Sequence, residues 1–169
     1  MASLVTAFAI TLLLAAAWRD VASRVIPNEL CAAVALSGVA LQAMQGPAAL
    51  LAAIGVAALL FGALLVPFAA GALGGGDVKL ASALALGLAP LQAWQFITAT
   101  AIAGGMLGLL YITLNRALPR RGSAPPRGAS LPRRVLLAEL HRIRRRGTLP
   151  YGVAIAAGGA FVLLTRTGA

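Results

Sequence analysis

Residues 48–80, "AALLAAIGVAALLFGALLVPFAAGALGGGDVKL", decide the class of fold. The part at 48–72 holds no charged side chain and, as a helix, is long enough to cross the hydrocarbon core of a bilayer, which needs about 20 apolar residues. This run is followed by three glycines and Asp77, and a second apolar run starts at Val78. Because the chain has only four Asp and Glu residues, a carboxylate between two apolar runs needs a physical reason.

The composition of the whole chain agrees with a membrane protein. Of its 169 residues 60% are hydrophobic and 11% charged, and the mean hydropathy is +0.92, which is too apolar for an ordinary soluble domain. The sequence therefore predicts an all-α, polytopic membrane helical bundle of about six transmembrane helices, with residues 1–169 as a single domain. The expected spans are residues 2–18, 30–44, 48–72, 78–88, 93–114 and 151–165. The fourth is too short to cross alone, but it could extend through Leu91 or cross where the protein locally thins the bilayer.

Two short turns punctuate these runs, at Gln45-Gly46-Pro47 and at Ala89-Pro90. Pro and Gly interrupt helices, so the helices on either side of each turn are predicted to be antiparallel neighbours. The first run is interpreted as a span and not as a removable signal peptide, because no Lys or Arg precedes Trp18.

The basic residues predict the orientation of the bundle. With the N-terminus outside, thirteen of the fourteen Lys and Arg residues lie in cytoplasmic segments and only Arg166 lies outside, as the positive-inside rule requires. The pI of about 11.8 is therefore a topology signal. We expect membrane lipid as a partner and no nucleic acid, since no basic surface with interleaved aromatic residues is present.

The connection at 115–149 has two parts. Residues 116–132, "RALPRRGSAPPRGASLP", have the composition of a flexible linker. Residues 133–146, "RRVLLAELHRIRRR", place Leu136, Leu140 and Ile143 along one helical face among arginines. This pattern fits a helix on an anionic membrane surface, and a solvated basic loop is the alternative.

The inventory of reactive side chains is small. Cys31 and His141 are the sole cysteine and histidine, so the sequence predicts no disulfide framework, no metal site and no cofactor. It also lacks a convincing Ser/His/Asp set. Chemistry on this chain would have to depend on its carboxylates.

Two of the four carboxylates have simple structural explanations. Glu139 lies among arginines and is expected to pair with them. Glu29 follows Asn28 at the start of the second span, where Asn28 can cap the helix and an acid suits its positive end.

Asp20 and Asp77 also have structural explanations, but they share a position. Asp20 could pair with Arg24 one turn later, and Asp77 could cap the helix that follows the glycines. In the predicted topology, however, both lie at the cytoplasmic end of a helix, at the same depth. Two carboxylates brought close in a partly dry site share a proton. One can then take a proton from an attacking water while its protonated partner donates a hydrogen bond to the oxyanion.

Three stretches resemble a known family. "GGGDVK" at 74–79 resembles the Gly-x-Gly-Asp motif of intramembrane aspartyl proteases, and "DVASRVIPN" at 20–28 resembles the first aspartate motif of type IV prepilin peptidases. "LPYGVAIAAGG" at 149–159 is similar to the last helix of the small members. Presenilins and signal peptide peptidases share Gly-x-Gly-Asp, but they are larger and use a Tyr-Asp pair that this chain lacks.

The resemblance implies which residues form the site. Asp20 and Asp77 match the catalytic pair, and the glycines would let an extended peptide approach Asp77 and adopt unusual backbone angles. For Lys79 we favour anchoring at lipid headgroups over stabilisation of ionised Asp77. The positions that match the motifs or lie near the substrate, without an assigned catalytic role, are Gly74, Gly75, Gly76, Lys79, Ile26, Pro27 and Asn28.

The resemblance also implies an activity. It predicts an endopeptidase of the bacterial inner membrane, with its active site on the cytoplasmic side, that removes the short basic leader from prepilin or pilin-like precursors. Larger members carry an N-terminal segment with paired cysteines and methylate the product. This chain looks like the short form, similar to the enzymes of tight-adherence (Flp) pili, so methyltransferase activity is not expected.

Two other classes of function remain open at this point. A proton-coupled carrier also uses intramembrane acids, although these are expected near the membrane midplane. A non-catalytic subunit of pilus assembly is the other alternative. Gly104 and Gly108 have the spacing of a packed helix face, which would suit any of the three functions.

Overall fold

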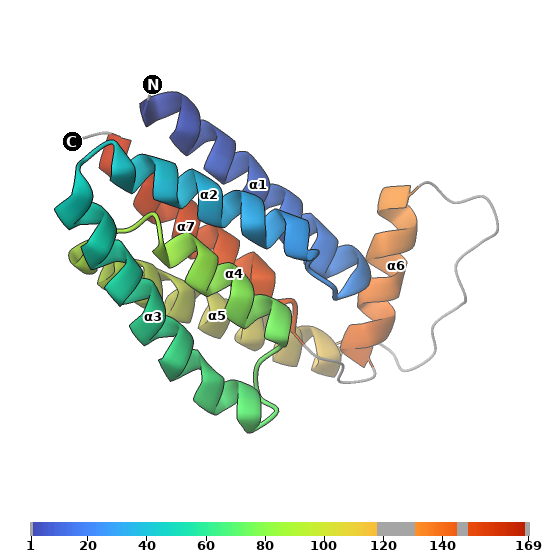
Figure 1. The fold of residues 1–169 in the computed structure, drawn as a ribbon. Helices are drawn as coiled ribbons and strands as arrows, with labels where there is room; N and C mark the ends of the chain where they lie inside the picture. Colours follow the sequence, from blue (N-terminus) through green and yellow to red (C-terminus); the bar gives the residue numbers. More distant parts are fainter. Residues whose placement is uncertain (1, 118–130, 145–148, 168–169) are drawn as a thin grey trace.

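The computed structural model describes residues 2–117, 131–144 and 149–167, and every regular element in these ranges is a helix (Figure 1). The prediction of an all-α bundle is therefore confirmed. The helices are α1 (Ala2–Ser23), α2 (Asn28–Ala43), α3 (Pro47–Ala69), α4 (Gly75–Ala85), α5 (Pro90–Ala117), α6 (Leu131–Arg144) and α7 (Tyr151–Thr167).

The six apolar helices alternate in direction through the bundle (Figure 1). The C-terminal ends of α1 and α5 and the N-terminal ends of α2, α4 and α7 consequently lie at one end, where α6 also packs. The two ends of the described chain lie together at the opposite end. This arrangement brings residues near 20, 77 and 152 to the same end of the molecule.

The helices differ in their ability to cross a bilayer. Three are long and apolar enough by length and composition: Ser3–Ser23, Pro47–Ala69 and Pro90–Ala117. Helices α2 and α7 are apolar but shorter, and α4 has 11 residues. At about 1.5 Å per residue, α4 covers roughly half of the bilayer core. The structure thus supports a membrane bundle, and the number of six crossings stays a prediction.

Apolar side chains both fill the interior and cover the outside. The core is built from α1, α2, α4, α5 and α7. Leu13, Leu80, Ile155 and Phe96 are among its fully buried side chains. On the outer face of α3, Leu51 and Leu59 are 70% and 77% exposed. Exposure of so large an apolar surface to water is unfavourable, whereas contact with apolar lipid tails is not.

Helix α5 packs mainly against α7 and not against α4, which instead lies against α2 and α3. The prediction that the Ala89-Pro90 turn joins antiparallel neighbours is therefore wrong. Small residues explain the preference of α5, because an added Cβ on Gly104 would lie 2.9 Å from the Tyr151 ring, and one on Gly158 would overlap Thr100. Gly104 thus lies on a packed face, whereas Gly108 has only a loose contact with Leu149.

The helix predicted at 133–146 is confirmed as α6, which spans Leu131–Arg144. Helix α5 continues to Ala117, beyond the start of the predicted linker. The predicted apolar face of α6 is only partly buried. Ile143 is buried against the bundle, whereas Leu136 is exposed. Contact of α6 with lipid stays a prediction. The predicted linker falls mostly at 118–130 and the end of the basic segment at 145–148, and both lie outside the described residues.

Candidate active site

Asp20 lies in the last turn of α1, because this helix continues past Trp18 to Ser23. The side chain is buried, with 6% of the residue exposed. Its Oδ2 atom accepts a hydrogen bond of 2.8 Å from the backbone N–H of Gly152. The expected ion pair with Arg24 is not formed, and Arg24 pairs with Glu139 instead.

Gly152 belongs to the first turn of α7, where backbone N–H groups have no partner inside the helix and favour a negative charge. A Cβ atom at this position would lie 2.9 Å from Oδ2 and 3.1 Å from Cβ of Asp20. Only glycine therefore lets α7 approach the carboxylate this closely. Our sequence reasoning missed Gly152, although the start of an apolar helix after Pro150 was a usable signal.

Asp77 lies in the first turn of α4, at its third residue. The cap position belongs to Gly74, and no side-chain cap hydrogen bond is made there. The alternative explanation of Asp77 as an N-cap is thus not supported. Its Oδ1 atom is buried and has no hydrogen-bond partner among the described residues, so the capacity of this oxygen to accept a hydrogen bond is unused.

The glycines before Asp77 provide space and not an unusual conformation. Gly74 has φ −75° and ψ 145°, which any residue can adopt. A Cβ on Gly74 would lie 2.9 Å from Oδ2 of Asp77, and one on Gly76 would lie 3.3 Å from Ile26. The predicted role of these glycines in unusual backbone angles is wrong, and the predicted approach of an extended peptide to Asp77 stays a prediction.

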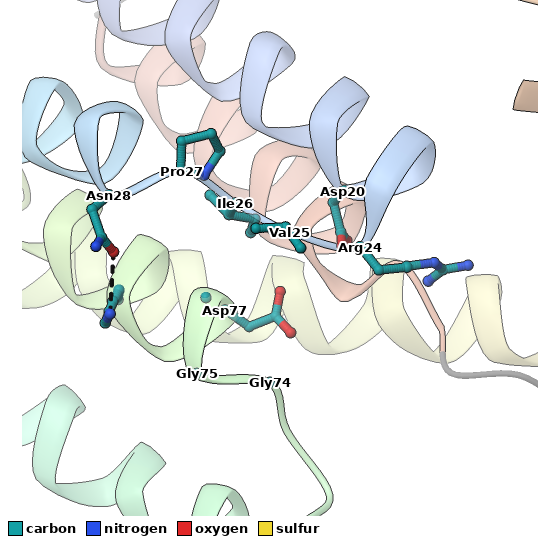
Figure 2. A pocket seen from close by; sticks show the side chains of 11 residues that line it. Asp20, Arg24, Val25, Ile26, Pro27, Asn28, Gly74, Gly75 and Asp77 are labelled. Atoms are coloured by element: carbon teal, nitrogen blue, oxygen red, sulfur yellow. Dashed lines mark hydrogen bonds between the residues drawn. The ribbon is translucent and has the colours of Figure 1, made fainter.

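Both aspartates line one pocket of about 430 Å³ at the end of the bundle (Figure 2). They reach it from different helices, Asp20 from α1 and Asp77 from α4. Every residue of the predicted site lines this pocket, together with Arg24 and Val25, which the sequence had not indicated. The full lining is Asp20, Arg24, Val25, Ile26, Pro27, Asn28, Gly74, Gly75, Gly76, Asp77 and Lys79.

Lys79 and Asn28 join two walls of the pocket. The Nζ atom of Lys79 donates a hydrogen bond of 3.1 Å to Oδ1 of Asn28 (Figure 2). Asn28 does not cap α2 as predicted, because Pro27 occupies the cap position and Asn28 is the first helical residue. Glu29 does lie in the first turn of α2, as expected. The lipid-anchor role of Lys79 stays a prediction.

A second, smaller pocket of about 130 Å³ adjoins Asp77 and is lined mainly by apolar side chains of α3, α5 and α7. Asp77 therefore lies between a polar pocket and an apolar one. Among the described residues, no group of three or more His, Cys, Asp or Glu side chains could hold a metal ion. The lining of this apolar pocket is Leu60, Leu64, Leu73, Asp77, Ala81, Phe96, Ile97, Thr100, Ala101, Tyr151 and Ile155.

Comparison with known proteins agrees with the motif resemblance. The model of the type IV leader peptidase family matches residues 7–112, a range that includes both aspartates, the glycines and the 26–28 segment. No curated protein matches, and no solved structure matches. The match covers more than half of the chain, so the protein belongs to the type IV leader peptidase family.

Proposed function

We propose that this protein is an intramembrane aspartyl endopeptidase that removes the leader from prepilin-like precursors, with Asp20 and Asp77 as the catalytic pair. The observation that carries the proposal is the shared pocket. Two carboxylates, 57 positions apart in the sequence and on different helices, line one cavity at the end of an apolar bundle. Membership of a leader peptidase family supplies the class of reaction.

The two carboxylates divide the chemistry of hydrolysis. The ionised one takes a proton from a water molecule as the water oxygen bonds to the peptide carbonyl carbon. The protonated one donates a hydrogen bond to the developing oxyanion. The C–N bond then breaks, and the leaving nitrogen takes the proton that the first carboxylate had removed from water, so the pair again holds a single shared proton. Gly152 would hold Asp20 in place through its N–H group, and Asp77 would act from the opposite helix that lines the same pocket.

The surroundings of the pocket support a substrate with a polar leader and an apolar helix. The outer surfaces of α3 and α5 are apolar over most of their length, so an apolar segment could lie beside them in the bilayer. Helix α6, whose sequence is rich in arginine, lies at the pocket end (Figure 1). We infer that this end faces the cytoplasm of a bacterial inner membrane, where positive loops are retained.

The experiment is to co-express the protein with a pilin-like precursor carrying a basic leader, a Gly before the cut and an apolar helix. The mass of the product is then compared for the native chain, Asp20→Asn and Asp77→Asn. The proposal requires a shortened product that depends on both aspartates and has a free, unmethylated N-terminus. Glu29→Gln is the matched control, because Glu29 is exposed and does not line the pocket.

Cleavage that persists at the native rate in either aspartate variant would remove that residue from the mechanism. Absence of cleavage by properly inserted native protein, over several precursors of this pattern, would instead favour a carrier or an assembly subunit.

The membrane face has its own measurement, in a Cys31→Ser background. An impermeant thiol reagent should reach Ala72→Cys, at the pocket end, from the cytoplasmic side and Gln45→Cys from the outside. Both positions are exposed. The reverse pattern would contradict a cytoplasmic active site.

A further inference from the structure

A buried polar cluster lies beside the proposed active site, where α6 meets the end of α1. Its centre is Glu139 of α6, which is 8% exposed. The Glu139 carboxylate accepts hydrogen bonds from Arg24 after α1, Tyr111 of α5 and Arg142 of α6. Three segments that are distant in the sequence therefore meet at one carboxylate. The sequence predicted pairing with arginines, and it indicated neither Tyr111 nor the link to the pocket.

Arg142 fixes this cluster to α1. Its guanidinium donates hydrogen bonds of 2.7 and 3.3 Å to the carbonyl oxygens of Val21 and Ala22. Carbonyl groups at the C-terminal end of a helix lack intrahelical partners and favour a cation. Helix α6 is thereby held against the last turn of α1, which also carries Asp20.

Arg24 has an unusual backbone conformation for its residue type. Its φ of 58° lies in the left-handed region, and no other non-glycine residue in the described ranges has a positive φ. Its N–H donates to the carbonyl of Asp20 at 2.8 Å, which closes α1 in the manner of a left-handed C-terminal cap. Glycine is the usual residue there, so an arginine in this conformation is strained and needs other contacts to hold it.

The Arg24 side chain lines the proposed active site, but it points away from both aspartates (Figure 2). Glu139 binds its Nη2 atom, while the buried Nε and Nη1 atoms have no partner among the described residues. Asp20 lines the same pocket four positions earlier in the chain. A guanidinium released from Glu139 would have a carboxylate within its own pocket to bind, and arginine–carboxylate pairs are strong when bidentate.

We propose that Glu139 is a positioning residue of the peptidase, which holds the Arg24 guanidinium away from Asp20. Asp20 then keeps Gly152 as its hydrogen-bond donor and stays available to exchange a proton with water. The inference rests on the proposed function, because it requires Asp20 to be catalytic. It also assigns a role to α6, which lies beyond the part of the chain that the family model matches.

The test compares Glu139→Gln with the double variant Glu139→Gln/Arg24→Gln in the precursor-cleavage assay. The glutamine keeps the size of the side chain but removes the charge that competes for Arg24. We expect kcat to fall about tenfold or more in Glu139→Gln, with KM changed less than threefold, because the released arginine would act on Asp20, the carboxylate proposed to take part in the chemical step. Removal of that arginine in the double variant should recover most of kcat.

One further measurement separates the positioning role from a structural one. Hydrogen exchange of the α6 amides should be faster in both variants, because each lacks the ion pair that docks this helix. Recovery of kcat without recovery of docking would support an action through Arg24. A Glu139→Gln variant with native kcat, or a double variant as slow as the single one, would overturn the inference.

The same series includes Asp20→Asn, Asp77→Asn and the control Glu29→Gln. Cleavage by either aspartate variant at the native rate would contradict the proposed function itself. Inactive aspartate variants beside a fully active Glu139→Gln variant would leave the proposed function intact and overturn only the role of Glu139.

Discussion

The two aspartates of the pocket are held in different ways. Asp20 is buried and receives a hydrogen bond from Gly152, more than a hundred residues away in the chain. Asp77 is half-buried in the first turn of its own helix, next to glycines, and its Oδ1 has no partner among the described residues. The hydrogen bond of Asp20 thus depends on tertiary packing, whereas the space for the Asp77 carboxylate comes from Gly74, three residues earlier in the chain.

The largest expected effect is loss of one of the two carboxylates that we propose to be catalytic. If both aspartates share one proton, Asp20→Asn and Asp77→Asn should each lower kcat by about 10³-fold or more, because neither can replace the other. Product mass and initial rates with the precursor measure this. A much smaller loss for one aspartate would show that only the other is catalytic and that this one has a structural role.

Gly152→Ala should have the next largest effect. The added Cβ would lie 3.1 Å from both Cβ and Cγ of Asp20, so rotation of the side chain alone cannot relieve the contact. Either α7 or Asp20 must shift, and we expect kcat to fall by about 10²-fold, since small misplacements at a reacting centre are costly. The readout is initial rate at equal amounts of inserted protein.

Gly62→Ala is the matched control for this change, because an added Cβ on Gly62 of α3 meets no atom within 4 Å. Native kcat in Gly152→Ala would show that the close approach of α7 to Asp20 is not needed for turnover.

Gly74→Ala should have a smaller effect on the other wall. Its Cβ would meet only the carboxylate end of Asp77, with Oδ2 at 2.9 Å and Cγ at 3.8 Å. A carboxylate can rotate away, so we expect about a tenfold decrease in kcat. Comparison with Gly105→Ala, which meets open space, isolates the local contact. A loss as large as that of Gly152→Ala would contradict the view that Asp77 has the freer position.

The contrast also explains what the sequence could predict. Asp77 and the glycines that make room for it are neighbours in the sequence, so the motif at 74–79 indicated all of them. The surroundings of Asp20 depend on segments distant in the sequence, because Gly152 of α7 donates a hydrogen bond to it and Glu139 of α6 pairs with Arg24. Neither contact has a local signature in the sequence. Apolar runs predicted the helices well, but their pairing depended on small residues such as Gly158, whose partners are visible only in three dimensions.

The smallest effect should come from the link between the two walls. The Lys79–Asn28 hydrogen bond is exposed, and an exposed polar contact of this kind contributes about 1 kcal/mol or less. Lys79→Ala should therefore lower kcat/KM by only a few fold. We expect the same small decrease in kcat/KM for Asn28→Ala. The double variant should be no slower than either single variant, because each substitution removes the same hydrogen bond. Additive losses would show that each side chain acts independently, and a loss as severe as that of Asp77→Asn would place Lys79 in the chemistry itself.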